Sequence, residues 1–118
     1  MTSDTQRAGV TIARLEDMLG GWFVGAFQPA VLASDAMEVA VKRYPAGAKE
    51  AVHVHLVATE VSLLVEGRAR MAGRDIGPGD IVVLSPGTAS GLETFEPCTM
   101  VVVKSPSVLG DKYLLEEG

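Results

Sequence analysis

Short apolar segments separated by turn-forming residues follow one another from position 37 to position 105. Gly, Pro or Asp bounds each of them, in stretches such as YPAGAK, MAGRD, GPGD and SPGT. Short strands at this spacing indicate an antiparallel sandwich or barrel rather than alternating strands and helices. The seven segments expected to be strands are MEVAVKRY, VHVHLV, EVSLLVEG, RARMAG, DIVVLS, TASGLETF and CTMVVVKS.

Length and composition fit one folded domain over residues 1–118. The chain is 47% hydrophobic but only 5% aromatic, so its core must be built from Val, Leu, Ala, Met and Ile. The only cysteine, Cys98, excludes an internal disulfide and is expected in the core, in a protein of a reducing compartment.

Charge and hydropathy exclude two classes of partner. The net charge is −5 and no run of Lys or Arg is present, which argues against nucleic acid. No apolar run approaches the roughly 20 residues of a membrane-spanning helix, and the first ten residues lack the pattern of a secretion signal. We therefore expect a cytoplasmic protein that binds neither nucleic acid nor membrane.

The two ends of the chain are less regular. Ile12, Leu15, Met18 and Leu19 recur at helical spacing, which predicts a short N-terminal helix over residues 12–19 that stops at two glycines. The tail from position 105 either returns as an edge strand or crosses to a neighbouring chain.

Both histidines of the chain, His53 and His55, lie on one predicted strand. Side chains two positions apart share a strand face, so both imidazoles can reach one cation. Glu60 follows after a bend and shares a face with Ser62 and Leu64. Two imidazoles and one carboxylate suit a divalent first-row metal and leave coordination positions open. The alternative is that the histidine pair is hydrogen-bonded within a core.

The spacing around these residues resembles the first motif of the cupin superfamily. Gly47, His53, His55, Glu60 and Gly67 match that motif without a gap, and the glycines suit turns with positive φ. The second cupin motif is similar to Gly79, Asp80, Pro86 and Gly87 here. It departs at Ser90, which stands where the motif has its third histidine, and at Thr94, where it has an asparagine.

The resemblance covers about residues 36–104 and implies an all-β fold, the cupin jelly roll or double-stranded β-helix barrel, often assembled as a homodimer. It also implies a site for Fe, Mn, Ni or Zn. The expected ligands are His53, His55 and Glu60, with the Ser90 hydroxyl behind them as a partner for metal-bound water. Glu93 is a weaker candidate for a substitute carboxylate, because it is expected to point outward or into a loop.

Further pocket residues depend on which face of each strand turns inward. In MEVAVKRY one face ends in Arg43 and the other in Tyr44; an inward arginine would attract a carboxylate or phosphate. Tyr44 and Glu93 are candidates for proton transfer. Trp22 and Phe27 either stack on a sugar or belong to the core. Thr94 and Lys104 are expected at the surface or rim.

Two functions remain open for a chain that resembles cupins. The first is a metal-dependent enzyme, a dioxygenase or isomerase, that acts on a small polar metabolite such as a sugar or carboxylic acid. The second is a non-catalytic module that binds or senses a small ligand with a relic metal site.

Overall fold

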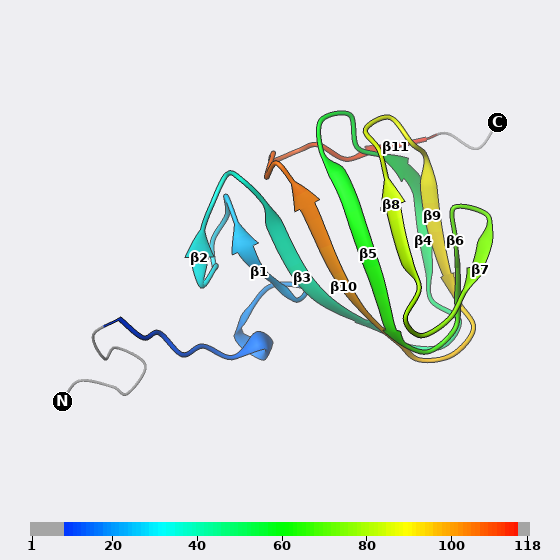
Figure 1. The fold of residues 1–118 in the computed structure, drawn as a ribbon, viewed down its shortest axis with the longest axis horizontal. Coiled ribbons are helices and arrows are strands. Elements are labelled where there is room, and N and C mark those ends of the chain that lie inside the picture. Colours follow the sequence, from blue (N-terminus) through cyan, green and yellow to red (C-terminus); the bar gives the residue numbers. More distant parts are fainter. Residues whose placement is uncertain (1–8, 116–118) are drawn as a thin grey trace.

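Two antiparallel sheets face one another in the computed structural model, which describes residues 9–115 (Figure 1). The first sheet has the order β2-β1-β3-β10-β5-β8 and the second β11-β4-β9-β6-β7. β2 is the exception in the first sheet, because it pairs with β1 in parallel. The strands are β1 (Trp22–Gly25), β2 (Leu32–Ala33), β3 (Glu38–Tyr44), β4 (Lys49–Val54), β5 (Thr59–Glu66), β6 (Ala69–Met71), β7 (Arg74–Ile76), β8 (Ile81–Leu84), β9 (Ser90–Thr94), β10 (Cys98–Ser105) and β11 (Tyr113–Leu114).

Each of the seven segments predicted to be a strand contains one, which confirms the all-β jelly roll. The turns between them follow the glycines. Gly47 and Gly67 have φ of +78° and +96°, as expected for the two glycines of the first motif. At Gly67 a Cβ would also lie 2.3 Å from the carbonyl oxygen of Pro97, so only glycine fits there.

The hydrophobic core fills part of the space between the two sheets. Its centre is Leu64 on β5 and Met100 on β10, both almost fully buried. Cys98 is 2% exposed within the same cluster, which confirms its placement in the core. Apolar side chains fill one end of the barrel in this way, and polar side chains line the other.

The predicted helix over residues 12–19 is wrong in extent. Only a 3₁₀ turn, η2 (Leu15–Asp17), is present, and the residues before it run away from the barrel (Figure 1). Leu15 and Met18 are partly buried beside Phe23 and Val41, but Ile12 and Leu19 are 57% and 69% exposed, so only half of the apolar stripe packs against residues 9–115. An isolated helix of this length is unstable without such packing.

The tail returns as an edge strand, one of the two outcomes left open by the sequence. β11 pairs antiparallel with β4, with Leu114 opposite His53. Within the described part of the chain, no helix is both long and apolar enough to cross a membrane.

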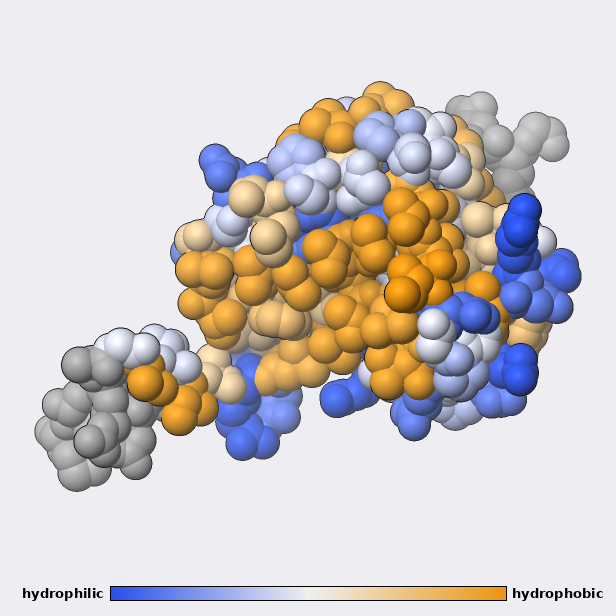
Figure 2. Space-filling view, viewed as in Figure 1, coloured by the Kyte–Doolittle hydropathy of each residue, from blue (hydrophilic) through white to orange (hydrophobic). Residues whose placement is uncertain are grey.

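The outer face of the six-stranded sheet is apolar. Figure 2 shows a broad hydrophobic band over the region where Figure 1 shows β3, β10, β5 and β8. On β8, Ile81 and Val83 are 63% and 61% exposed. Antiparallel sheets with one solvated face usually carry polar residues there, so this face has the composition of a covered one. The outward apolar side chains of the four strands include Val39, Val41, Val61, Leu63, Ile81, Val83, Val101 and Val103, while Arg43, Thr59 and Thr99 lie on the same face nearer the strand ends.

Candidate metal centre

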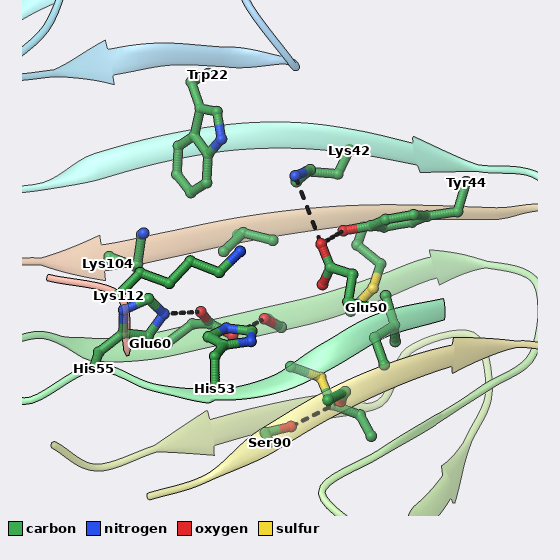
Figure 3. A pocket seen from close by; sticks show the side chains of 16 residues that line it. Trp22, Lys42, Tyr44, Glu50, His53, His55, Glu60, Ser90, Lys104 and Lys112 are labelled. Carbon is green, nitrogen blue, oxygen red and sulfur yellow. Dashed lines mark hydrogen bonds and ion pairs between the residues drawn. The ribbon is translucent and has the colours of Figure 1, made fainter. Parts of the chain in front are cut away.

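A cavity of about 60 Å³ lies between the sheets at the polar end of the barrel, with both histidines in its wall (Figure 3). The six-stranded sheet contributes inward side chains of β3, β5 and β10, and the other sheet contributes β4 and β9. The lining residues are Trp22, Lys42, Tyr44, Glu50, His53, His55, Glu60, Ser62, Met71, Ser90, Gly91, Leu92, Met100, Val102, Lys104 and Lys112.

An irregularity in β4 decides which of its side chains reach the cavity. The pairing of β4 with β9 shifts register between Glu50 and His53, while Ala51 and Val52 are exposed. Because of this shift, Glu50 and His53 both line the cavity although they are three positions apart. β5 keeps regular alternation, which turns Glu60, Ser62 and Leu64 inward as the sequence predicts.

The three predicted metal ligands converge. Among residues 9–115, ligand atoms of His53, His55 and Glu60 all lie within 4.8 Å of one another. His55 Nε2 is 3.3 Å from Glu60 Oε1, and these two residues are only 6% and 7% exposed. The geometry therefore allows one small cation to contact all three side chains.

Backbone carbonyls set the orientation of both imidazoles. Nδ1 of His53 is 2.9 Å from the carbonyl oxygen of Ala51, and Nδ1 of His55 is hydrogen-bonded to that of Asp111. A carbonyl only accepts, so each Nδ1 carries the proton and donates it. In the neutral imidazole Nε2 then presents a lone pair, which is the tautomer that a metal-binding histidine requires. The donor set thus fits a divalent first-row ion.

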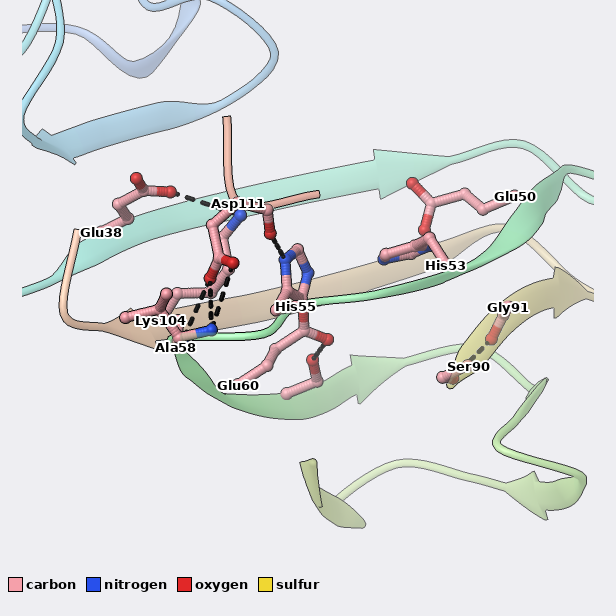
Figure 4. Close-up of polar contacts among 12 residues, drawn as sticks. Glu38, Glu50, His53, His55, Ala58, Glu60, Ser90, Gly91, Lys104 and Asp111 are labelled. Atoms are coloured by element: carbon pink, nitrogen blue, oxygen red, sulfur yellow. Dashed lines mark hydrogen bonds and ion pairs between the residues drawn. The ribbon is translucent and has the colours of Figure 1, made fainter. Parts of the chain in front are cut away.

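Asp111 holds the end of β4 in place from a distant part of the chain (Figure 4). Its carboxylate accepts from the backbone N–H groups of Leu56, Val57 and Ala58, with N–O distances from 2.9 to 3.2 Å. Burial alone would raise the pKa of this carboxyl, but the three donors outweigh it and hold the pKa below its usual value. The segment that follows β10 therefore fixes both the loop after His55 and the ring of His55.

Glu60 has its own supporting partner. The hydroxyl of Ser62 donates to Glu60 Oε2 at 3.2 Å, which leaves Oε1 directed at His55. The sequence places Ser62 on the same face as Glu60, but only the structure identifies it as the partner of the carboxylate.

Ser90 lies directly across from His53 in the sheet and is buried, at the rear of the cavity. Its hydroxyl donates to the Gly91 carbonyl at 2.9 Å and accepts from the Ala72 N–H at 3.2 Å. These backbone contacts take up its only proton, so the hydroxyl is left with acceptor capacity alone towards the cavity.

Of Tyr44, Arg43 and Glu93, only Tyr44 reaches the cavity. Its hydroxyl donates to Glu50 Oε2 at 3.3 Å. Burial and the negative charge of Glu50 raise the pKa of Tyr44, so it remains a protonated donor at neutral pH. Arg43, on the opposite face of β3, is exposed, and so is Glu93 on β9; the structure brings neither of them to the cavity.

Thr94 is not a surface residue, contrary to the sequence-based expectation. It is 1% exposed, and its hydroxyl donates to the Pro45 carbonyl at 2.7 Å and accepts from the Ala48 N–H at 2.9 Å. A threonine that closes a turn in this way is buried because it satisfies backbone groups that would otherwise be unpaired.

Sequence reasoning did not place lysines in the cavity: Lys104, expected at the surface or rim, has a side chain only 17% exposed and lines the wall. Lys42, Lys104 and Lys112 line it from three different segments, and Glu50 lies among them (Figure 3). Lys104 Nζ lies 4.8 Å from the centre of the Trp22 ring, and Lys42 Nζ lies 5.8 Å from it. The alternation of β3 with Tyr44 inward carries Lys42 with it, but no sequence signal relates Lys104 or Lys112 to the histidines.

Comparison with known proteins gives structural neighbours and no sequence family. No family model matches the chain, and no curated protein matches it significantly. An uncharacterized conserved protein with a double-stranded β-helix domain from Klebsiella pneumoniae superposes with a TM-score of 0.69 at 23% identity, over 99% of this chain and 98% of that chain.

Two further structural neighbours are KdgF and an oxalate decarboxylase. KdgF from Halomonas sp. superposes with a TM-score of 0.59 at 22% identity, over 64% of this chain and 74% of that one. Oxalate decarboxylase from Bacillus subtilis, which has Mn(II) centres, superposes with a TM-score of 0.60 at 21% identity, over 70% of this chain and 25% of that one. Likeness at this identity concerns the fold. The chain therefore has the cupin fold, the double-stranded β-helix that its first motif predicts.

Proposed function

We propose that this protein binds a divalent metal through His53, His55 and Glu60 and acts with it on a small polar metabolite, a sugar or a carboxylic acid. The observation that carries the proposal is the convergence of three ligand atoms within 4.8 Å, with both imidazoles oriented by carbonyls. The Mn(II) centres of the oxalate decarboxylase support a metal in a barrel of this fold.

The chain supplies orientation and a partly enclosed cavity around such a centre. A divalent ion held there would supply Lewis-acid or redox chemistry at the positions that three protein ligands leave open. Tyr44 remains protonated and donates that proton to Glu50, so its hydroxyl oxygen is suited to accept a hydrogen bond from a substrate hydroxyl. We favour a dioxygenase or an isomerase, in the cytoplasm and as a homodimer.

Metal analysis of protein purified without an affinity tag tests the proposal. We expect about one divalent ion per chain, and loss of most of it in His53→Ala. Glu93→Gln is the matched control, because it removes a carboxylate that faces away from the cavity. A metal-free wild-type protein, or equal metal in His53→Ala and wild type, would refute the metal centre. Oxygen uptake with a panel of sugars and acids then separates a dioxygenase from an isomerase.

One observation favours a second function, a non-catalytic module that binds or senses a small ligand. Ser90 stands where the cupin motif has its third histidine, and its proton is committed to Gly91. A site with one imidazole fewer binds metal less tightly. A metal-loaded protein that binds a ligand from the panel and converts none of them supports this alternative.

A further inference from the structure

Three lysines stand at the junction of two cavities. The first is the cavity of about 60 Å³ that contains the triad, here called the metal cavity, and the second is an adjoining groove of about 330 Å³. Both are lined by Lys42 on β3, Lys104 on β10 and Lys112 before β11. Trp22 also lines both. Figure 3 shows Lys104 and Lys112 beside His55 and Glu60. Lys42 lies farther along the cavity, next to Glu50. A ligand that passes from the groove to the metal cavity must pass these ammonium groups.

The lysines differ in how their charge is balanced. Lys104 Nζ lies 3.3 Å from Glu38 Oε1, and Lys42 Nζ lies 3.9 Å from Glu50 Oε2. The side chain of Lys104 is only 17% exposed, and an ammonium group withdrawn from water to this degree needs compensating partners. Lys112 is exposed and makes no ion pair with any residue between positions 9 and 115.

The carboxylates around these lysines are largely engaged. Glu38 accepts from the Ser107 hydroxyl at 2.8 Å, Glu50 accepts from Tyr44, and Asp111 accepts from three backbone N–H groups. Glu60 faces His55 in the triad. Glu50 and Glu38 thus balance Lys42 and Lys104, and Glu60 belongs to the triad, so Lys112 is the one of the three lysines without a carboxylate partner among residues 9–115.

The sizes of the two spaces constrain the ligand further. A volume of 60 Å³ holds about two water molecules, at roughly 30 Å³ each, and so admits only a small end of a ligand. The groove of about 330 Å³ lies at the lower limit of small-molecule sites, which begin at roughly 300 Å³. A ligand would place a small oxygen-bearing end in the inner cavity and its larger body in the groove.

We propose that the ligand is a carboxylate-bearing metabolite whose acid group docks among Lys42, Lys104 and Lys112 while another of its oxygen atoms reaches the metal cavity. This inference rests on the proposed function and names the substrate class of the same site. A single carboxylate matches the one unpaired ammonium group, that of Lys112, whereas a phosphate monoester brings nearly two negative charges at neutral pH.

Calorimetric titration of Zn-loaded protein with matched pairs tests the proposal. The probes are glucuronate against glucose, lactate against propane-1,2-diol, and glucose 6-phosphate. We expect at least one acid to bind at least about tenfold more tightly than its uncharged partner, since a charge-assisted hydrogen bond contributes about that much. Lys112→Gln should weaken that binding about tenfold and leave metal content unchanged. Lys49→Gln, an exposed lysine on β4 outside both spaces, is the matched control and should change nothing.

Four results would overturn the carboxylate assignment: no acid binds, the uncharged partners bind as tightly, only the sugar phosphate binds, or Lys112→Gln behaves like Lys49→Gln. A parallel titration of protein stripped of metal separates this proposal from the metal centre. Acid binding that persists there, with the same dependence on Lys112, supports the anion site while contradicting the role of the metal.

Discussion

A single side chain outside the metal ligands sets the geometry of one of them. Asp111 accepts from three backbone N–H groups after β4 with its carboxylate, and from His55 with its carbonyl. Partners of this kind, behind the ligands themselves, change metal affinity by about 10- to 100-fold when they are altered. Asp111 is therefore a positioning residue for the metal centre.

We expect Asp111→Ala to lower the free energy of unfolding by about 1–3 kcal/mol, because three backbone donors lose their acceptor. Metal affinity should fall about 10- to 100-fold because, without the carboxylate, the segment whose backbone carbonyl binds His55 is no longer fixed to residues 56–58. Chemical denaturation and competition with a metal chelator measure the two effects. Asp111→Asn keeps one side-chain oxygen and should recover part of both. Wild-type metal affinity in Asp111→Ala would show that the carboxylate is not needed to hold the segment that orients His55.

The thiol of Cys98 should be unreactive in the folded protein. Burial raises its pKa, so the thiolate fraction at a given pH is smaller than for an exposed cysteine. We expect negligible alkylation by iodoacetamide at pH 8 in native protein and rapid alkylation in denaturant, as measured by mass spectrometry. Fast modification of native protein at this pH would contradict the buried position.

At the level of elements, the sequence predicts strands better than it predicts their inward faces. The turn residues between positions 37 and 105 locate all seven predicted strands, and the motif spacing brings together His53, His55 and Glu60. The register shift in β4 has no local signal, so Glu50 was missed. Pairing between distant strands is likewise absent from the local pattern, which is why Lys104 and Lys112 were not foreseen.

The prediction of a helix over residues 12–19 was wrong in extent for a related reason. Helical spacing predicts a helix only where the apolar stripe has something to pack against, and here Leu19 and Ile12 face solvent. The positions of Thr94 and Arg43 also depend on the environment that the fold creates around them, which the local sequence does not encode. The sequence left the orientation of β3 undecided, and pairing with β1 and β10 turned Tyr44 inward and Arg43 outward.

Gly91 is expected to maintain the register shift in β4. A Cβ at this position would lie 2.9 Å from the Glu50 carbonyl oxygen and 3.3 Å from Val52 Cγ2, so the two strands would have to separate. Gly91→Ala should cost about 1–3 kcal/mol of stability and also weaken metal binding, because Glu50 and His53 flank the shift. Denaturation and chelator competition measure both.

Gly73→Ala is the comparison for that variant, since nothing lies within 4 Å of a Cβ there and only the positive φ opposes the substitution. Equal metal affinity in Gly91→Ala and Gly73→Ala would mean that the register shift does not position His53.

At the level of the whole molecule, the apolar outer face of the six-stranded sheet stands out, because residues 9–115 leave much of it facing solvent. A mainly aliphatic surface is complementary to another of the same kind, and a second copy related by a two-fold axis supplies one. The homodimer implied by the resemblance to cupins stays a prediction, and this face is where we expect it to form.

Val83→Lys should convert that dimer to a monomer. Val83 is 61% exposed, so a lysine there is tolerated by the single chain but would place a charge in the apolar interface. Light scattering coupled to size exclusion measures the mass, with a shift from about twice the chain mass to once. Val52→Lys on the other sheet, 38% exposed in the wild type, is the control and should stay dimeric. A monomeric wild type, or a dimeric Val83→Lys, would place the interface elsewhere or exclude it.

The contact between His55 and Asp111 joins residues that are 56 positions apart. During synthesis His55 leaves the ribosome well before Asp111 has been added to the chain. The nascent protein therefore lacks the group that orients its second imidazole, and the proposed ion would bind only after translation, when residues 53–60 and 111 have come together.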